Sequence, residues 1–300
     1  MKNPLVYIIL LNYNGYKDTI ECVESLERIT YSNYKIIIVD NASSDESEII
    51  LKEKFSQHIY IQTGSNLGFA GGNNVGIEYA LKNGADYVCL LNNDTIVERD
   101  FLEPLVENAE KDKYIGVVSG KICYYNEPNK IWFAGGSINP WTGITKHFKL
   151  NQIDKGKENV QITTGYVTGC LMLVKREVII NVGMMNDKYF LYYEETDWNV
   201  RIRRYGYKII VDYRSKIYHK ISASTSKVSN LTTYYFIRNR HYFVNSNYGT
   251  ISKLFIFIVI RYILLKKALK AWALRDKDRL NILKRTYQDI KNKTMGRFTE

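Results

Sequence analysis

The sequence predicts an α/β protein built on a doubly wound sheet, and two observations carry this prediction. Short apolar runs rich in β-branched residues are typical of strands covered on both faces of a parallel sheet, and they occupy residues 6–11, 35–39 and 87–91. Helix-like stretches lie between or beside them. Alternating strands and helices imply right-handed crossovers, and therefore an open sheet over roughly the first 120 residues.

The individual elements follow in chain order. The run Val6 to Leu11 is too short for the apolar region of a secretory leader, and the turn-like sequence of residues 12–15 follows it at once, so we expect a buried first strand. The three helix-like stretches cover residues 17–27, 46–55 and 74–82. The second follows good cap residues, Ser43 to Asp45, and the third ends at Gly84.

The pattern changes after about residue 115. Between residues 115 and 175 the chain has glycine-spaced, aromatic-rich segments and no helical pattern before Arg176, which favours antiparallel strands. A helix is expected from about Glu195 to Arg204, ending near Gly206, with a strand at residues 208–211 after it.

Composition and charge narrow the class of protein. The chain has 300 residues, 45% of them hydrophobic, with only 4 prolines, which excludes a disordered or collagen-like protein. Residues 251–300 hold 13 Lys and Arg against 4 Asp and Glu, which is +9 of the total formal charge of +11. Because the first 250 residues are nearly neutral, a nucleic-acid-binding protein is disfavoured. The 4 cysteines show no CxxC pair, so we expect a reduced, cytoplasmic compartment.

The C-terminal segment resembles a membrane-surface helix. Residues 254–265 are apolar apart from Arg261 and the hydroxyl of Tyr262, and as a helix they span about 18 Å, short of the roughly 30 Å hydrocarbon core. Basic residues interleaved with apolar ones follow, which is typical of a helix lying in an anionic lipid interface. The alternatives are a basic helix packed on the catalytic domain and a dimer contact. We divide the chain into residues 1–230 and a helical, membrane-associating region, residues 231–300.

The glycine-rich stretch at residues 64–74 invites a dinucleotide-binding interpretation, which fails. It contains no G-x-G-x-x-G and does not directly follow the first strand, where that motif belongs, and the chain has no P-loop. A nicotinamide enzyme and a P-loop ATPase are therefore disfavoured. The stretch can still allow close backbone approach to a ligand at a helix start, and a tight strand-to-helix turn is the alternative.

Polar residues at strand ends are the candidates for chemistry, because ligands of such sheets bind at the carboxyl ends of the strands. The candidate loops are residues 12–15, 40–45 and 92–95. Asp94 fits a hard cation that bridges a diphosphate, although a strand-end Asp is often only a turn former.

An acidic motif and one histidine add to these loops. Residues 194–197 hold three carboxylates, of which Asp197 forms an i,i+4 pair with Arg201 while Glu195 points elsewhere. Crowding should raise the pKa of Glu195 and suit it to general-base catalysis, whereas acids at a helix start can also serve only the helix dipole. His219 directly follows a strand, and a lone histidine is more often structural than a ligand.

Taken together, these residues resemble the inverting family-2 glycosyltransferases of the GT-A fold, especially the rhamnosyltransferase-like branch. The resemblance covers about residues 5–245 and rests on an ordered set of motifs: Ile8 to Gly15, Ile38 to Asp45, Asn66 to Asn73, Leu91 to Thr95, Tyr193 to Asp197, and His219 with Ser222 to Ser224. It implies a GT-A catalytic domain, Rossmann-like with a doubly wound mixed sheet, followed by basic amphipathic helices.

The resemblance also implies roles for individual residues. Asp40 would read a pyrimidine ring, and Asp94 with His219 would hold Mg²⁺ or Mn²⁺. Asn92 stands where the family usually has an acid, so we expect weak metal binding that depends on the donor's phosphates. Glu195 matches the catalytic base. The nucleotide-binding set is Leu11, Asn12, Tyr13, Asn14, Asp40, Asn41, Asn66, Gly68, Ala70, Gly71, Asn73, Asn92, Asn93 and Asp94, and the acceptor and support set is Glu194, Asp197, Trp198 and Arg201.

These matches predict a metal-dependent inverting glycosyltransferase. The expected donor is dTDP-rhamnose, with a UDP-sugar as the alternative, and the acceptor is a cell-surface glycan or a lipid-linked precursor. We expect the protein at the cytoplasmic face of the membrane, bound through residues 251–285. A nucleotide-sugar-binding protein without activity, suggested by Asn92, and a membrane-surface scaffold are the competing hypotheses.

Overall fold

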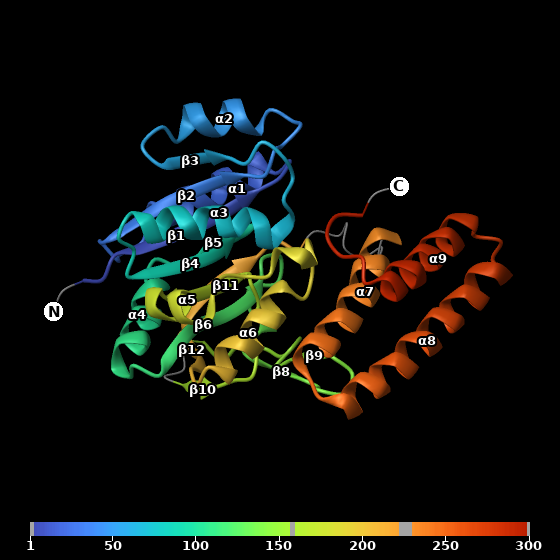
Figure 1. Ribbon diagram of the computed structural model, residues 1–300. Coiled ribbons are helices and arrows are strands. Elements are labelled where there is room, and N and C mark those ends of the chain that lie inside the picture. Colours follow the sequence, from blue (N-terminus) through green and yellow to red (C-terminus); the bar gives the residue numbers. More distant parts are fainter. Residues whose placement is uncertain (1–2, 157–159, 222–229, 299–300) are drawn as a thin grey trace.

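A ten-stranded mixed sheet forms the centre of the molecule (Figure 1). The computed structural model describes residues 3–156, 160–221 and 230–298, and Ser222 to Ser224, part of the motif set above, lie outside them. The strand order is β10-β12-β6-β11-β4-β1-β2-β3, with β5 paired to β12 and β7 to β6, while β8 and β9 form a separate hairpin. The strands are β1 Val6–Asn12, β2 Tyr34–Asp40, β3 Ile59–Gln62, β4 Tyr87–Asn92, β5 Thr95–Val97, β6 Ile115–Tyr124, β7 Ile131–Phe133, β8 Gly136–Ile138, β9 Thr145–His147, β10 Gln161–Thr163, β11 Leu171–Lys175 and β12 Lys208–His219.

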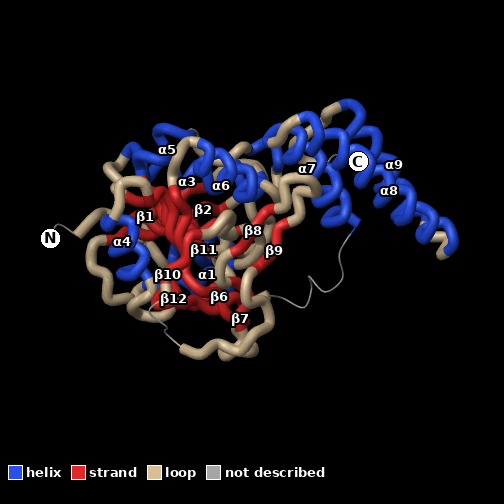
Figure 2. The backbone as a smooth tube through the Cα atoms, turned by 90° about the horizontal axis from the view of Figure 1, so that it is seen from below, coloured by secondary structure: helices blue, strands red, loops and turns tan. Residues whose placement is uncertain are grey.

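Helices cover both faces of this sheet, as predicted for a doubly wound fold. The chain reverses direction along the sheet between β3 and β4, so right-handed crossovers place α3 on the face opposite α1. Figure 2 shows α3, α5 and α6 along one face. The helices are α1 Tyr16–Leu26, α2 Ser47–Lys54, α3 Gly68–Lys82, α4 Leu102–Lys111, α5 Arg176–Val182, α6 Glu194–Arg204, α7 Asn230–Asn247, α8 Thr250–Ala273 and α9 Lys277–Asn292, with a short 3₁₀ helix at Asp187–Tyr189.

Most predicted elements are confirmed, with two corrections to their bounds and one to their pairing. The helix expected at residues 74–82 begins at Gly68, inside the glycine-rich stretch. The strand expected at residues 208–211 continues to His219, because an irregularity between Asp212 and Lys216 lets the chain resume its pairing with β6. Antiparallel pairing holds for β11 with β4 and β6, but β6 and β12 pair parallel.

The three C-terminal helices form a second packed unit beside the sheet (Figures 1 and 2). Asn239 of α7 anchors them: its side-chain amide lies 2.8–2.9 Å from the carbonyl oxygens of Tyr189, Leu191 and Tyr192. Arg238, which is buried, donates to the carbonyl oxygen of Gly296 at 2.9 Å. The C-terminal helices are therefore tied to the loop that precedes α6.

Helix α8 packs with one face and exposes the other. Ile256, Ile260 and Leu264 are buried against α7 and α9. A stripe of apolar residues on the outer side is exposed: Ile251, Leu254, Phe255, Ile258, Tyr262, Leu265, Leu269 and Trp272. A search of the described residues finds no helix that combines the length and the apolar character needed to cross a bilayer.

Candidate active site

Strand register brings the predicted polar loops to one edge of the sheet. In the parallel pairing, Asn12 at the end of β1 lies beside Asp40 at the end of β2, and Leu11 lies beside Asn92 at the end of β4. Asp40 in turn pairs with Gln62 of β3. Four loops therefore leave the sheet side by side, where ligands of open α/β sheets bind.

The carboxylate of Asp40 holds two of these loops together from inside. It is fully buried and accepts four hydrogen bonds, from the Asn12 amide at 2.7 Å, the Ser43 hydroxyl at 2.5 Å, the Ser43 backbone N–H at 3.0 Å and the Gln62 amide at 2.8 Å. Asn12 is equally buried and accepts from Thr19 at 2.8 Å. A buried charge is stable only when its hydrogen bonds are made. Asn12 and Asp40 thus set the shape of the site, and a contact of Asp40 with a base stays a prediction.

A pocket of about 720 Å³ opens beside this edge. Of the predicted nucleotide-binding residues, it is lined by Leu11, Tyr13, Asn41, Asn66, Gly68 and Asn93. The ring of Tyr13 is 47% exposed, which leaves a face free to stack on a base. Asn41 bridges the loops: its amide donates to Asn66 at 3.2 Å and to the Gly68 carbonyl at 3.1 Å. Asn14 and Asn92 lie outside the pocket lining, and Asn14 accepts from the Ser44 backbone N–H at 2.7 Å.

The glycine-rich stretch packs closely against its neighbours, and a contact of this stretch with a nucleotide stays a prediction. A Cβ on Gly68, whose φ is +75°, would lie 2.2 Å from the carbonyl oxygen of Phe190, and a Cβ on Gly71 would lie 2.8 Å from Leu67. Ala70 and Asn73 are buried, and the Asn73 amide donates to the Phe69 carbonyl at 2.9 Å. The side chains of Ala70 and Asn73 therefore face the protein interior rather than the pocket.

Sequence reasoning missed the far wall of the pocket. It is formed by Phe190, Leu191, Leu231, Thr232, Tyr235, Arg297 and Phe298. The Tyr235 hydroxyl accepts from the Phe298 backbone N–H at 2.8 Å, which fixes the end of the chain over the site. No local motif marks these residues, because they reach the pocket only through the packing of α7.

The predicted metal pair, Asp94 and His219, comes together at the ends of β4 and β12. Asp94 Oδ1 lies 3.1 Å from His219 Nε2. Within the described residues these two atoms form an ion pair without a well-aligned hydrogen bond, and the buried His219 Nδ1 has no hydrogen-bond partner. Burial lowers the pKa of His219, but the opposing effects of Cys170 and Asp94 together outweigh burial and raise this pKa to about 10.

The donor set fits a hard cation in part. Among the residues that the structure describes, no group of three or more His, Cys, Asp or Glu side chains is arranged to hold a metal. The carboxylate of Asp94, and the imidazole of His219 once it has lost its proton, suit an ion that receives its remaining oxygens from a diphosphate. The weak, donor-dependent binding expected from Asn92 stays a prediction.

Glu195, in the first turn of α6, has the surroundings expected of a base. The Tyr166 hydroxyl donates to Glu195 Oε1 at 3.1 Å, and burial raises the pKa of Glu195. Its neighbour Glu194 is only 3% exposed, its Oε2 has no partner among the described residues, and burial together with Glu195 raises its pKa well above the usual range. Glu194 therefore keeps its proton more readily than Glu195.

The other residues of the acidic motif support the helix rather than face the pocket. Asp197 receives Arg201 at 2.7 Å and the Asn247 amide at 2.6 Å, which links α6 to α7. Trp198 is fully buried, and its ring N–H donates to the Gly183 carbonyl at 2.8 Å, so it packs in the core. The backbone just before α6 is strained, with positive φ at Phe190, Tyr192 and Tyr193, as is often found at functional sites.

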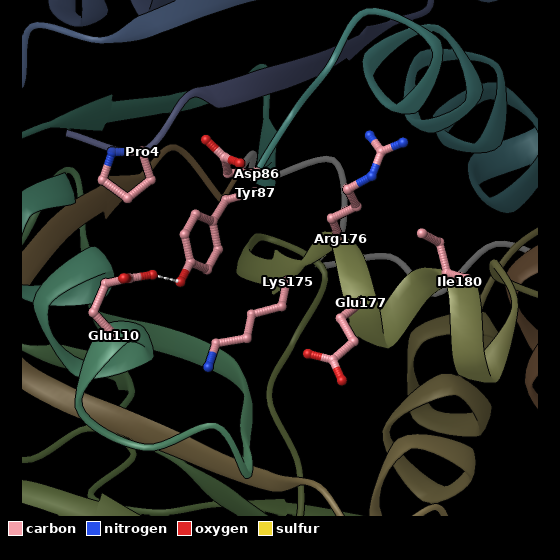
Figure 3. Close-up of a pocket in the computed structure, with 8 residues that line it drawn as sticks. All are labelled: Pro4, Asp86, Tyr87, Glu110, Lys175, Arg176, Glu177 and Ile180. Carbon is pink, nitrogen blue, oxygen red and sulfur yellow. Dashed lines mark hydrogen bonds between the residues drawn. The ribbon is translucent and has the colours of Figure 1, made fainter. Parts of the chain in front are cut away.

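Gly169 lies between Glu195 and the pocket. A Cβ built on Gly169 would lie 3.0 Å from the ring of Phe69, which lines the pocket, and 3.7 Å from the Cβ of Glu195. Glu195 and the pocket wall thus approach the same small space. By contrast, a pocket of about 520 Å³ at the opposite edge of the sheet, between Tyr87, Glu110 and Lys175, contains none of the predicted residues (Figure 3).

Comparisons with known proteins agree with this geometry. The family model described as glycosyl transferase family 2 matches residues 7–183. The dTDP-rhamnosyl transferase RfbF of Shigella flexneri is 23% identical over 263 residues, which cover 82% of each chain. The low-salt glycan biosynthesis hexosyltransferase Agl10 of Haloferax volcanii is 27% identical over 247 residues, covering 80% of this chain and 75% of that protein.

A solved structure has the same fold. GalNAc-T7 with UDP, GalNAc and Mn²⁺ superposes with a TM-score of 0.63 at 15% identity, covering 85% of this chain and 54% of that chain. The fold is that of the GT-A glycosyltransferases. The chain belongs to glycosyl transferase family 2.

The hydrogen bond from Tyr166 gives a prediction for pH dependence. This bond favours the charged form of Glu195 and so lowers its pKa, partly offsetting burial. Tyr166→Phe should raise the pKa of Glu195, so the acid limb of donor turnover against pH moves to higher pH, while turnover on the plateau changes little. Tyr124→Phe, whose hydroxyl donates to exposed Asn151, is the control and should keep the wild-type profile. An unmoved acid limb in Tyr166→Phe would remove Glu195 as the titrating base.

Proposed function

We propose that the protein transfers a sugar from a nucleoside diphosphate donor to a hydroxyl of a cell-surface glycan or lipid-linked precursor, with inversion and with Glu195 as the base. The observation that carries this proposal is the position of Glu195, which is held by Tyr166 and shares the space at Gly169 with a wall of the 720 Å³ pocket. A nucleotide-sugar-binding protein without activity would have no need for a base in this place.

The chemistry proposed for these residues is a single displacement. Glu195 removes the proton of the acceptor hydroxyl while that oxygen attacks the anomeric carbon, and the bond from this carbon to the diphosphate oxygen breaks with its electron pair. The hydrogen bond from the Tyr166 hydroxyl favours the charged form of Glu195, which is the form that can accept the proton. Asp94 and His219 would hold Mg²⁺ or Mn²⁺, whose charge stabilises the departing diphosphate.

The proposed donor is dTDP-rhamnose. This is supported by the name of the RfbF relative, by the exposed ring of Tyr13 and by the pocket beside Asn41 and Asn66. A UDP-sugar is the second candidate, because GalNAc-T7 was solved with UDP and Mn²⁺.

We also propose that the protein works at the cytoplasmic face of the membrane, with the outer side of α8 in the lipid interface. The exposed stripe of α8 contains Leu265, Leu269 and Trp272, each more than half exposed, and the basic residues of α8 and α9 flank it. An apolar face flanked by basic side chains is typical of a helix that lies in the interface of an anionic membrane. A second copy of the chain covering this stripe is the alternative.

Glu195→Gln tests the reaction. It preserves the shape of the side chain but removes the base, so donor turnover should fall by about 100-fold or more, the scale of general-base catalysis. Nucleotide binding, measured by calorimetry, should stay within experimental error. Glu177→Gln, an exposed acid of the pocket in Figure 3, is the matched control. Near-normal turnover by Glu195→Gln would contradict the assignment.

The membrane proposal is tested by charge placed in the exposed stripe. The double variant Leu269→Glu and Trp272→Glu should lower co-sedimentation with vesicles of anionic phospholipid, because carboxylates are costly to bury in the interface. Ile180→Glu, a similarly exposed apolar residue on α5, should sediment as the wild type does. If the α8 variant binds vesicles normally and instead dissociates a dimer in sedimentation velocity, the stripe is a protein contact.

A further inference from the structure

A second large pocket lies between the C-terminal helices and the catalytic domain. Its volume is about 770 Å³, slightly larger than that of the donor pocket. It is formed by the segment Ile144 to Thr145 at β9, by Tyr193 before α6, and by residues of α7, α8 and α9. None of the predicted site residues lines it.

The charge of this pocket is one-sided. No carboxylate is among the described residues that line it. Its cationic lining residues are Arg240, Lys266, Lys267, Lys270 and Arg279. No ion pair in the described chain includes Lys266, Lys267, Lys270 or Arg279. Burial lowers the pKa of Lys267, and Arg279 and Lys270 lower it further. Cations crowded without a counter-charge repel each other, and a bound anion would relieve this repulsion.

The rest of the lining is apolar. Ile144, Phe236, Ile237 and Ile263 face the same space as the cations. This combination suits a ligand that is part anion and part hydrocarbon better than a free inorganic ion. A flat basic surface for nucleic acid would lack both the concavity and the apolar floor.

The pocket is continuous with the exposed stripe of α8. Ile263, Lys266, Lys267 and Lys270 recur at helical spacing on one side of α8, and Tyr262 belongs both to the stripe and to the pocket. A membrane that covers the stripe would therefore place its phosphate-bearing surface level with these lysines. The anionic end of an amphiphile could enter the pocket while its hydrocarbon chain stays in the bilayer.

Two segments that line the pocket are connected to Glu195 through the chain or through side-chain contacts. Tyr193, two residues before Glu195, donates its hydroxyl to the Gly143 carbonyl at 3.1 Å and so fixes the wall of the pocket. On β9, His147 follows the pocket residue Thr145 closely, and its ring stacks on Tyr166 at 6.0 Å between centroids. Tyr166 donates to Glu195. The walls of the pocket are thus the structures that position the base.

We propose that this pocket binds the phosphate or diphosphate group of a membrane-embedded, lipid-linked acceptor and presents the acceptor sugar to Glu195. The inference rests on the proposed function and specifies its acceptor class. The cations of α7, α8 and α9 hold the anionic group, the apolar residues hold the first part of the lipid chain, and Tyr193 separates this site from the base.

The test compares vesicles of equal surface charge. The full-length protein is titrated with zwitterionic vesicles that carry either a polyprenyl diphosphate or an anionic phospholipid such as phosphatidylglycerol. The wild type should bind the diphosphate vesicles about tenfold or more tightly, the scale of one charge-assisted hydrogen bond. Inorganic pyrophosphate at the same concentration should compete weakly, because it lacks the lipid chain.

Three variants test whether the pocket causes the preference for the diphosphate lipid. Lys267→Gln with Arg279→Gln should remove the preference for the diphosphate lipid. The matched control, Lys277→Gln with Lys284→Gln, changes the net charge equally at exposed positions of α9 outside the pocket and should keep the preference. Lys270→Gln alone, at an exposed position, should weaken the preference without disturbing the fold, which thermal unfolding checks.

The outcomes separate this inference from the proposed function. Equal binding of both vesicle types by the wild type, an unchanged preference in the pocket variant, or pyrophosphate competing as well as the lipid would overturn the acceptor site. Nucleotide binding and donor turnover with water as acceptor are measured in parallel. If these persist while the lipid preference is absent, only the acceptor inference fails; if both are absent in the wild type, the proposed function fails too.

Discussion

The buried carboxylate of Asp40 is the constraint on which the site depends. Parallel register places the ends of β1, β2 and β3 side by side, but it does not fix the loops that leave them. Four hydrogen bonds to Asp40, from Asn12, Ser43 and Gln62, do so. Because an unpaired buried charge costs several kcal/mol, loop arrangements that break this network are disfavoured. The pocket beside Asn41 and Tyr13 takes its shape from this network.

The candidate site is completed by residues that follow residue 183, where the match to the family model ends. The family model ends at residue 183, whereas Glu195, His219, Tyr235 and Phe298 all follow it. Asn239 of α7 holds the loop before α6, and Asn247 reaches Asp197. The C-terminal helices therefore act on both sides of the site: they close the strand-end pocket and position the helix that carries Glu195, the proposed base. Removing them would disturb the base as well as any membrane contact.

Sequence patterns predicted the sheet and its strand-end loops because both depend on local signals. Buried parallel strands read as apolar runs, and the polar residues after them share an edge by topology. Asn41, Asn66 and Asn93 therefore line the pocket, and their part in binding a nucleotide stays a prediction. In the glycine-rich stretch the structure adds a packing role, since a Cβ on Gly68 would clash with Phe190 and one on Gly71 with Leu67.

The far wall of the donor pocket and the cationic pocket could not be predicted in this way. Arg297 is remote in sequence from Tyr13, and Arg240 is remote from Lys267, and only the packing of α7 and α8 brings each pair to a common cavity. The sequence shows that the C-terminal segment is basic. It does not show that some of these basic side chains line a pocket. Periodicity reports which side of a helix is buried, not which distant segment it meets.

The central claim is that the strand-end pocket binds a pyrimidine nucleoside diphosphate with a divalent cation at Asp94. Calorimetric titration of the full-length protein with dTDP, UDP, GDP and NAD, each with and without Mn²⁺, tests it most directly. The account predicts binding of dTDP or UDP that strengthens with Mn²⁺, and loss of the metal-dependent part in Asp94→Ala. Binding of NAD alone, or no binding of either pyrimidine nucleotide, would contradict it.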